Sequence, residues 1–392
     1  MIIAAHSTAT LRLVDVKAGT AVIVGEASPL LTVLSDERLY IRLGKLIKCC
    51  QGPVESFLSL GKELRKGEGA GQIYAVLELD RYDCNLISRR SITGFPEESY
   101  REFYQPLRIL VRRILSRQDR LLFGIVTEPF VCKKDFNPIV LSDPLYSLYF
   151  LLAILNSRLI SKLYVTGSAI SLKDDFRQTT LAELTNLKIR SIHFTTPKKD
   201  RIAAVEKGKH LYKQSLVIND LLCITAFVDH CLKQNPKQSD VVHDILAFLA
   251  EQMIEMNKEK QKEIKGFVKW LESQLRIQLD KEGSTGIEAL TGKTQIKNYL
   301  GDYQKKEEHL PFEDFWKILE KNKMRIQANL KSRELYENIR SEYEKSLSKL
   351  LPLKEKLRKT DWLIDQIVYR LYGLTGEDIK IVEGYGEGSG SF

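Results

Sequence analysis

The chain has 392 residues, 43% of them hydrophobic and 28% charged, which is typical of a folded protein that buries a sizeable core. Sixty Lys and Arg residues against 51 Asp and Glu give a formal net charge of +9, an excess compatible with a polyanionic partner. No apolar run reaches the roughly 20 residues of a membrane span, and the start MIIAAHSTAT lacks the pattern of a secretion signal. We therefore expect a cytoplasmic protein with no membrane partner and with its six cysteines reduced.

Residues 1–100 are predicted to form an N-terminal part whose fold the pattern leaves open. The stretches at 11–25 (LRLVDVKAGTAVIVG) and 71–80 (GQIYAVLELD) are typical of strands, and glycines interrupt the sequence between them. These strands do not add up to a self-contained module. This part is therefore either complete or the remainder of a larger domain.

Residues 101–197 have the pattern of an α+β module. An apolar strand is expected at 107–115 (LRILVRRIL), and residues 120–132 and 137–141 flank a turn-like segment, as in a hairpin. The segment 146–164 places five leucines on one face of a single predicted helix that packs on a sheet, namely Leu148, Leu152, Leu155, Leu159 and Leu163. Another strand follows at 187–194.

Residues 198–384 are predicted to form a mainly helical domain, followed by a flexible tail at 385–392. Helical periodicity continues to Pro236 and resumes over 240–279, and after a Gly/Ser/Thr break further helices run to Tyr372. Gly373 suits a left-handed helix stop, and Thr375 can cap a short acidic helix. The fold class predicted for the whole chain is thus α+β with a helical carboxyl-terminal domain.

The segment 288–300 (EALTGKTQIKNYL) resembles a phosphate-binding loop only in part. That loop needs a glycine with four residues between it and Gly-Lys-Thr, where Ile287 lies, and a strand in front of it. Gly286 is one position too early. The pattern therefore favours a turn between helices.

Four residues of types that bind metals, two cysteines and two histidines, occur close together in the helical part, namely Cys223, His230, Cys231 and His243. Their spacing lacks the paired Cys-x-x-Cys of a structural zinc site, and they follow an apolar helical pattern. Packing in the core is the favoured interpretation. We predict no metal site in this chain.

Catalytic signatures are weak. The acids and lysines at 173–176 (KDDF) and 262–265 (KEIK) are of the types a metal-dependent nuclease uses, but the second stretch has the pattern of a charged helix face. A base methyltransferase would need a glycine-rich cofactor loop and an Asn/Asp-Pro-Pro-aromatic motif, and neither is present in the sequence. We assign no catalytic and no cofactor-binding residue.

Basic residues concentrate between Arg101 and Lys134. This stretch contains three acidic residues and eight basic ones. The basic residues are Arg101, Arg108, Arg112, Arg113, Arg117, Arg120, Lys133 and Lys134. Arginine and lysine suit phosphate contacts, and the arginine fork can also contact guanine edges in the major groove. The alternative is a solvated basic face on an ordinary sheet.

Four segments in this order resemble the carboxyl-terminal region of bacterial restriction–modification enzymes with a TaqI-like specificity domain. They are PLRILVRRI, YFLLAILNSRLISKLY, FRQTTLAELTNLKIRSIHF and TDWLIDQIVYRLYGLTGEDIKIVEG, which together extend from about Tyr104 to Gly384. LIKCCQG at 46–52 resembles an earlier part of the same region. In that family a target-recognition domain grips DNA while a separate catalytic domain methylates a flipped adenine.

The resemblance implies that this chain is the DNA sequence-recognition part of an adenine-specific methyltransferase or endonuclease. Double-stranded DNA is the expected partner, with a separate methyltransferase or endonuclease polypeptide as a further candidate. S-adenosylmethionine, and Mg²⁺ for cleavage, are expected only on that catalytic part. The predicted DNA contacts are Arg108, Arg112, Arg113, Arg117, Arg120, Lys133, Lys134, Lys188 and Arg190.

Two alternatives remain open from the sequence. The chain is a complete methyltransferase or nuclease whose motifs go unrecognised, or it is a helical scaffold without affinity for DNA. Binding of S-adenosylmethionine by this chain alone would support the first alternative. Partner binding that survives loss of the basic residues would support the second.

Overall fold

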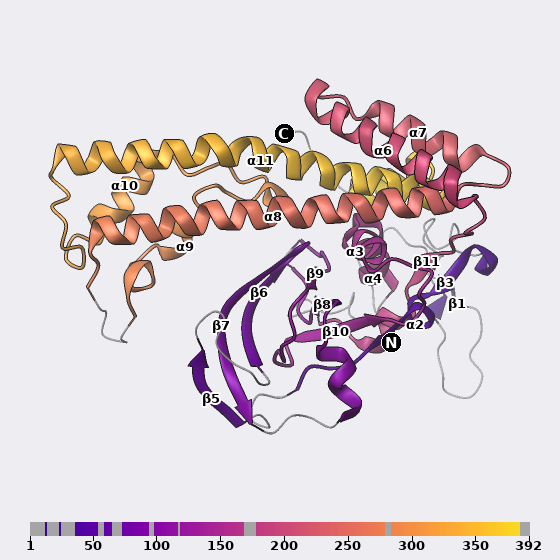
Figure 1. Cartoon of the computed structure of the whole chain (residues 1–392), viewed down its shortest axis with the longest axis horizontal. Helices are drawn as coiled ribbons and strands as arrows, with labels where there is room; N and C mark the ends of the chain where they lie inside the picture. Colours follow the sequence, from indigo (N-terminus) through magenta and orange to yellow (C-terminus); the bar gives the residue numbers. More distant parts are fainter. Residues whose placement is uncertain are drawn as a thin grey trace.

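The structure is a computed structural model that describes residues 12–13, 23–24, 36–53, 59–64, 73–93, 98–116, 118–167, 178–278 and 284–384. Strands and short helices occupy the first half of the chain, and long helices occupy the second (Figure 1). The α+β class with a helical carboxyl-terminal part is confirmed. Of the strand-like stretch 11–25, only two residue pairs are described, and they form antiparallel strands β1 (Arg12–Leu13) and β2 (Ile23–Val24).

The other strands form three antiparallel sheets among the described residues. Their bounds are β3 Tyr40–Arg42, β4 Ile47–Cys49, β5 Ser59–Leu64, β6 Ile73–Asp80, β7 Asp83–Thr93, β8 Arg108–Arg112, β9 Phe123–Val126, β10 Phe136–Leu141 and β11 Lys188–Arg190. The central sheet has the order β4-β10-β8-β9, a second has the order β5-β7-β6, and β11 pairs with β3. Short helices connect these strands: η1 Glu37–Leu39, α2 Leu43–Leu46, η3 Glu98–Tyr104 and α5 Leu181–Thr185.

The predicted hairpin of β9 and β10 is wrong. β8 lies between the two strands and pairs antiparallel with both of them. The first four residues of β8, at 108–111, are fully buried, as expected for a strand with neighbours on both sides. The segment between β9 and β10 instead crosses to the second sheet, where Val131 forms an isolated bridge with Tyr74 of β6.

The single helix predicted at 146–164 is two helices, α3 (Leu148–Asn156) and α4 (Arg158–Gly167), with a bend of 65° between them. At the break, the Ser157 hydroxyl donates to the Ile154 carbonyl, and the Arg158 amide donates to Asp365 at 2.8 Å. The five predicted leucines are all buried, as expected. In the part of the chain that the structure describes, no single helix has the length and hydropathy to cross a membrane, and α3 and α4 meet that criterion only as a bent pair.

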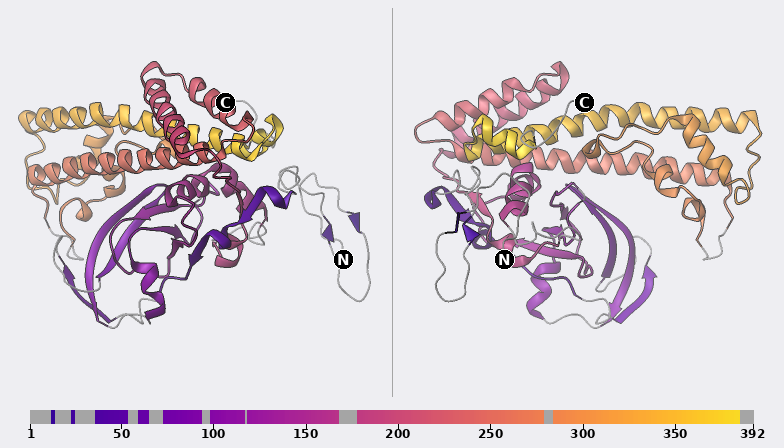
Figure 2. Two further views of the ribbon diagram at one scale, coloured as in Figure 1. Left: turned by 45° about the vertical axis from the view of Figure 1, so that its right-hand side comes forward. Right: turned by 180° about the vertical axis from the view of Figure 1, so that it is seen from behind.

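Two long antiparallel helices dominate the second half, α8 (Ser239–Leu275) and α11 (Arg333–Tyr372), and they lie side by side in all three views (Figures 1 and 2). The helices α6 (Lys198–Ile218) and α7 (Leu222–Lys233) pack against one end of this pair. The apolar faces of α3, α4, α6, α7, α8 and α11 share one hydrophobic core with the central sheet. Burial of that shared apolar surface is therefore what holds the strand-rich half against the helices.

The far end of the long helices carries a small helical tip with a core of its own. Its elements are η5 Gly286–Ala289, α9 Lys293–Lys297, η6 Tyr303–Lys305 and α10 Phe312–Lys321. Aromatic side chains fill this core, and the centroids of the Phe315 and Tyr343 rings, which are tilted by 43° to each other, lie 4.8 Å apart. The segment 288–300, which partly resembles a phosphate-binding loop, lies here. Lys293 and Lys297 both form ion pairs with Glu288.

The end of α11 confirms the predicted stop and cap. Gly373 has φ +71°, and its amide donates to the carbonyls of Tyr369 and Arg370. Thr375 and Asp378 form a reciprocal capping box that begins α12 (Gly376–Glu383). Val382 of α12 joins the main core, so this module closes the helical part against α4.

Candidate nucleic-acid interface

Four basic residues, which we call the basic corner, lie where β8 ends and β10 begins: Arg112, Arg113, Lys133 and Lys134. Arg112 is paired with Phe136 in the sheet, and the Arg113 amide donates to the Asp135 carbonyl at 2.8 Å. This register places both arginines beside the 133–135 turn. Arg112 and Lys134 are exposed, Arg113 is half-buried, and Lys133 forms an ion pair with Asp135 at 2.7 Å.

Arg108, also predicted to contact DNA, is fully buried at the start of β8. Its guanidinium donates to the backbone carbonyls of Tyr104, Gln105, Glu128 and Phe130 and lies 4.7 Å from the centre of the Phe130 ring. Burial lowers the pKa of this guanidinium from its ordinary value. In this position Arg108 ties η3 and the segment after β9 to the sheet, and it presents no donor to a ligand outside.

Arg120 belongs to a buried charge cluster, which we define as Arg81, Arg120, Asp361 and Asp365, and the exposed Arg158 contacts its edge. The Arg120 Nη2 donates to the Asn156 carbonyl at 2.6 Å, while its buried Nε has no hydrogen-bond partner among the described residues. Burial, with the nearby charge of Arg81, lowers the pKa of Arg120 to about 10. Like Arg108, it faces the interior, and we do not retain it as a DNA contact.

The buried charge cluster joins the strand-rich half to α11. Arg81, in the turn between β6 and β7, donates both Nη atoms to the Asp361 carboxylate, one of them at 2.8 Å. The two side chains are only 1% and 8% exposed, so the pair is almost fully removed from water. Asp365, one turn further along α11, accepts from both the amide and the Nε of Arg158.

The two predicted basic residues of β11 lie apart from the basic corner. Lys188 is half-buried with its Nζ 3.7 Å from Glu37, and Arg190 lies over the Tyr40 ring at 5.4 Å. Their register partner strand β3 adds Arg42 opposite Lys188, an exposed arginine that the sequence analysis did not single out. Arg117 lies outside the described residues.

Chain connectivity limits the distance between the two basic groups. The Thr179 amide donates to the Arg113 carbonyl at 2.7 Å, and Lys188 follows only nine residues later. Nine residues span at most roughly 30 Å when fully extended. The backbones of Arg113 and Lys188 are therefore separated by at most about 35 Å, which is comparable to one turn of a DNA duplex, about 34–36 Å.

The candidate metal ligands are dispersed in the structure. Cys231 is buried, the Cys223 thiol lies 3.0 Å from the Ser215 hydroxyl, and His230 is exposed on α7. Across the described residues, no group of three or more His, Cys, Asp or Glu side chains could hold a metal ion. Residues 173–176, the first of the nuclease-like stretches, lie outside the described part.

His243 has a structural role instead. Its Nε2 accepts from the Ser147 amide at 3.0 Å, so its Nδ1 carries the proton that it donates to Asp244 at 2.8 Å. The ring contacts the Phe150 ring at a tilt of 36°, with centroids 4.4 Å apart. Burial lowers the pKa of His243, although the Asp244 carboxylate opposes that shift.

We therefore expect His243 to make stability depend on pH. Because its pKa is below the ordinary 6.5 in the folded chain, unfolding takes up a proton at mildly acidic pH. This contribution is present above pH 6.5 and is lost as the pH falls toward the lowered pKa, with a slope of up to about 1.4 kcal/mol per pH unit. Urea unfolding between pH 7.5 and 5 should show that loss in the parent protein and a smaller one in His243→Gln, which retains an acceptor for Ser147. Equal pH profiles would contradict the assignment.

Residues 72–189 match the TaqI-like C-terminal specificity domain. The resemblance drawn from the sequence is thereby confirmed over the segment that contains β6 to β11, including the basic corner. A protein of Methanocaldococcus jannaschii, provisionally named as a type II restriction enzyme and methyltransferase, is 50% identical over 88 residues. That alignment covers 22% of this chain and 8% of the relative, so the two proteins share one segment and not their full lengths.

The TaqI-like segment begins before residue 101, where the sequence analysis had expected the α+β module to start. It includes the whole β6–β7 pair, which contacts both the central sheet and α8. Gly124 explains how closely these sheets approach, since a Cβ on it would lie 2.5 Å from the Leu79 side chain. The two sheets thus form one unit behind the basic corner.

Proposed function

We propose that this chain is the DNA sequence-recognition part of a restriction–modification system. The observation that carries the proposal is the match of residues 72–189 to a specificity domain, within which an exposed basic corner is held on a rigid sheet. Arg112, Arg113 and Lys134 would contact backbone phosphates or guanine edges, with Lys133 released from Asp135 on binding. Arg190 and Lys188 would provide a second contact within the same turn of duplex.

Methylation or cleavage would be carried out by a separate domain or polypeptide. The name of the M. jannaschii relative includes both activities, and this chain aligns with only 8% of that relative. S-adenosylmethionine and Mg²⁺ would bind that catalytic part, and the target base would be an adenine. The expected compartment is the cytoplasm, where the DNA is.

The helical half would then hold the recognition unit relative to the catalytic part. α8 and α11 together extend well beyond the sheets, and the tip at their end has its own core (Figure 1). The buried Arg81–Asp361 pair prevents the β6–β7 turn from moving independently of α11. Orientation of the basic corner would therefore follow the orientation of the long helices.

A mobility-shift assay on random-sequence duplex DNA tests the proposal. The assay is run over a salt series, with and without S-adenosylmethionine. We expect binding that weakens steeply with salt and does not respond to the cofactor, because phosphate contacts release counterions. Cofactor-dependent binding would favour a complete methyltransferase, and no binding at low salt would favour the scaffold alternative.

A further inference from the structure

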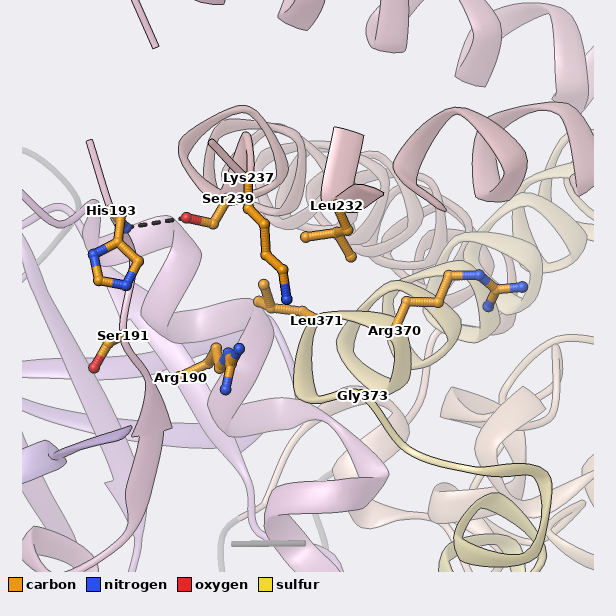
Figure 3. Close-up of a pocket in the computed structure, with 9 residues that line it drawn as sticks. All are labelled: Arg190, Ser191, His193, Leu232, Lys237, Ser239, Arg370, Leu371 and Gly373. Carbon is orange, nitrogen blue, oxygen red and sulfur yellow. Dashed lines mark hydrogen bonds between the residues drawn. The ribbon is translucent and has the colours of Figure 1, made fainter. Parts of the chain in front are cut away.

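A small basic pocket lies between β11, the connection from α7 to α8, and the end of α11 (Figure 3). Its volume is about 90 Å³, and its lining comprises Arg190, Ser191, His193, Leu232, Lys237, Ser239, Arg370, Leu371 and Gly373. This lining includes two arginines, a lysine and a histidine, but no carboxylate. Lys237 was not among the predicted DNA contacts.

Arg190, which is half-buried, and Lys237, which is exposed, both line the pocket. In Figure 3 the Lys237 side chain extends from the α7–α8 connection, and its Nζ is on the side that faces Arg190 of β11. Two cations among the lining residues, with no carboxylate beside them, make the pocket a favourable place for an anion. Arg370 does not share this role, because its guanidinium is turned toward Asp229 and the Gln366 carbonyl.

The negative groups near the pocket do not neutralise its positive charge. Asp36 is an acid near Arg190, but its lowered pKa is due mainly to its hydrogen bond with Arg38, and Arg190 contributes less. The carboxyl end of α11 carries partial negative charge, but the Gly373 amide occupies its Tyr369 and Arg370 carbonyls. Neither group points a free carboxylate into the space between Arg190 and Lys237.

The size and chemistry of the pocket suit a phosphate group. A volume of about 90 Å³ leaves room for several water molecules, and therefore for a phosphate group. The half-buried Arg190 offers a planar fork, and Lys237 adds a mobile point charge. The Ser239 hydroxyl already accepts from the His193 amide at 3.0 Å, which ties the start of α8 to the strand that carries Arg190.

We propose that Arg190 and Lys237 bind a phosphate group, and that in the DNA complex this group is a backbone phosphodiester outside the basic corner. That the bound phosphate belongs to DNA rests on the proposed function. That the pocket binds a phosphate group does not. Arg190 is the last residue of β11, and Lys237 lies two residues before α8, so the two sides of the site are attached to different elements. It would fix the position of the duplex relative to α8 and α11.

Two measurements on the full chain test the inference. The first titrates inorganic phosphate against a chloride control of equal ionic strength and follows the thermal unfolding midpoint. The second measures the salt slope of binding to random-sequence duplex DNA. Both use the parent protein, Lys237→Gln, Arg190→Gln and the matched control Lys233→Gln, which removes an exposed charge on α7 that does not line the pocket.

We expect phosphate to raise the unfolding midpoint of the parent and of Lys233→Gln, but not that of Lys237→Gln or Arg190→Gln. Lys237→Gln should also reduce the salt slope by about one, and lower DNA affinity without regard to sequence. Phosphate stabilisation that persists in both pocket variants would overturn the site. Loss of phosphate binding with an unchanged DNA slope would leave a site for free phosphate and overturn the phosphodiester assignment. If the parent fails to bind DNA, the proposed function fails, while the phosphate titration still decides the pocket.

Discussion

Replacement of Arg112, Arg113 and Lys134 by Ala should reduce the affinity for duplex DNA by roughly 10²- to 10³-fold near 0.1 M salt. Each lost phosphate contact lowers the salt slope by about 0.9, and three contacts therefore account for a decrease of nearly three. The substitutions should leave the fold intact, because two of the side chains are exposed and the third is half-buried. Fluorescence anisotropy over a salt series measures both the affinity and the slope.

The matched control removes three exposed lysines from the helical tip: Lys321, Lys323 and Lys331. It changes the net charge by the same amount, but at the end of the long helices remote from the sheets (Figure 1). We expect little change in its salt slope. If both triple variants lose affinity equally, long-range charge and not the basic corner determines binding.

Asp361→Asn should destabilise the protein by about 3–5 kcal/mol, because it leaves the Arg81 guanidinium buried without its counter-charge. Gln304 is the other hydrogen-bond partner of Arg81, at 3.3 Å, and as a neutral amide it does not compensate for a missing charge. Urea unfolding at neutral pH gives the free-energy difference. A loss below about 1 kcal/mol would contradict the account of a fully desolvated pair.

Two further variants test whether the loss of stability in Asp361→Asn comes from the unpaired buried charge of Arg81. Arg81→Met with Asp361→Leu removes both charges and should recover much of the lost stability, since apolar groups of similar volume often replace a buried ion pair without cost. Arg333→Ala breaks an exposed pair with Glu337 at the opposite end of α11 and should cost less than about 0.5 kcal/mol. If the double variant were as unstable as Asp361→Asn, the geometry of the contact and not its charge would be responsible.

Local patterns in the sequence were sufficient to predict the helical half. The stop at Gly373 and the cap at Thr375 depend on residues within one turn of each other, and both are confirmed. The five leucines of α3 and α4 are buried as expected, and their spacing predicted helix within each segment, although it did not reveal the bend between the two helices. The stop, the cap and the helical spacing need no knowledge of distant residues.

Features that depend on distant partners were not predictable from those patterns. The bend between α3 and α4 is stabilised by Asp365, more than 200 residues away in sequence from Arg158. β8 separates β9 from β10 although the two flank a turn-like segment, because strand order is decided by burial of the whole sheet. Arg108 and Arg120 were expected at the surface, where arginine usually lies, but backbone carbonyls from other segments satisfy their buried guanidinium groups in part.

Selection of bound duplexes from a random-sequence library tests most directly the central claim that the chain recognises a DNA sequence. The parent protein is incubated with the library at about 0.1–0.15 M salt, and the bound fraction is sequenced after several rounds. We predict enrichment of one short motif, and its loss in the triple variant of Arg112, Arg113 and Lys134. Binding that retains every sequence equally through all rounds would contradict the claim, and would leave only a salt-dependent affinity for phosphate.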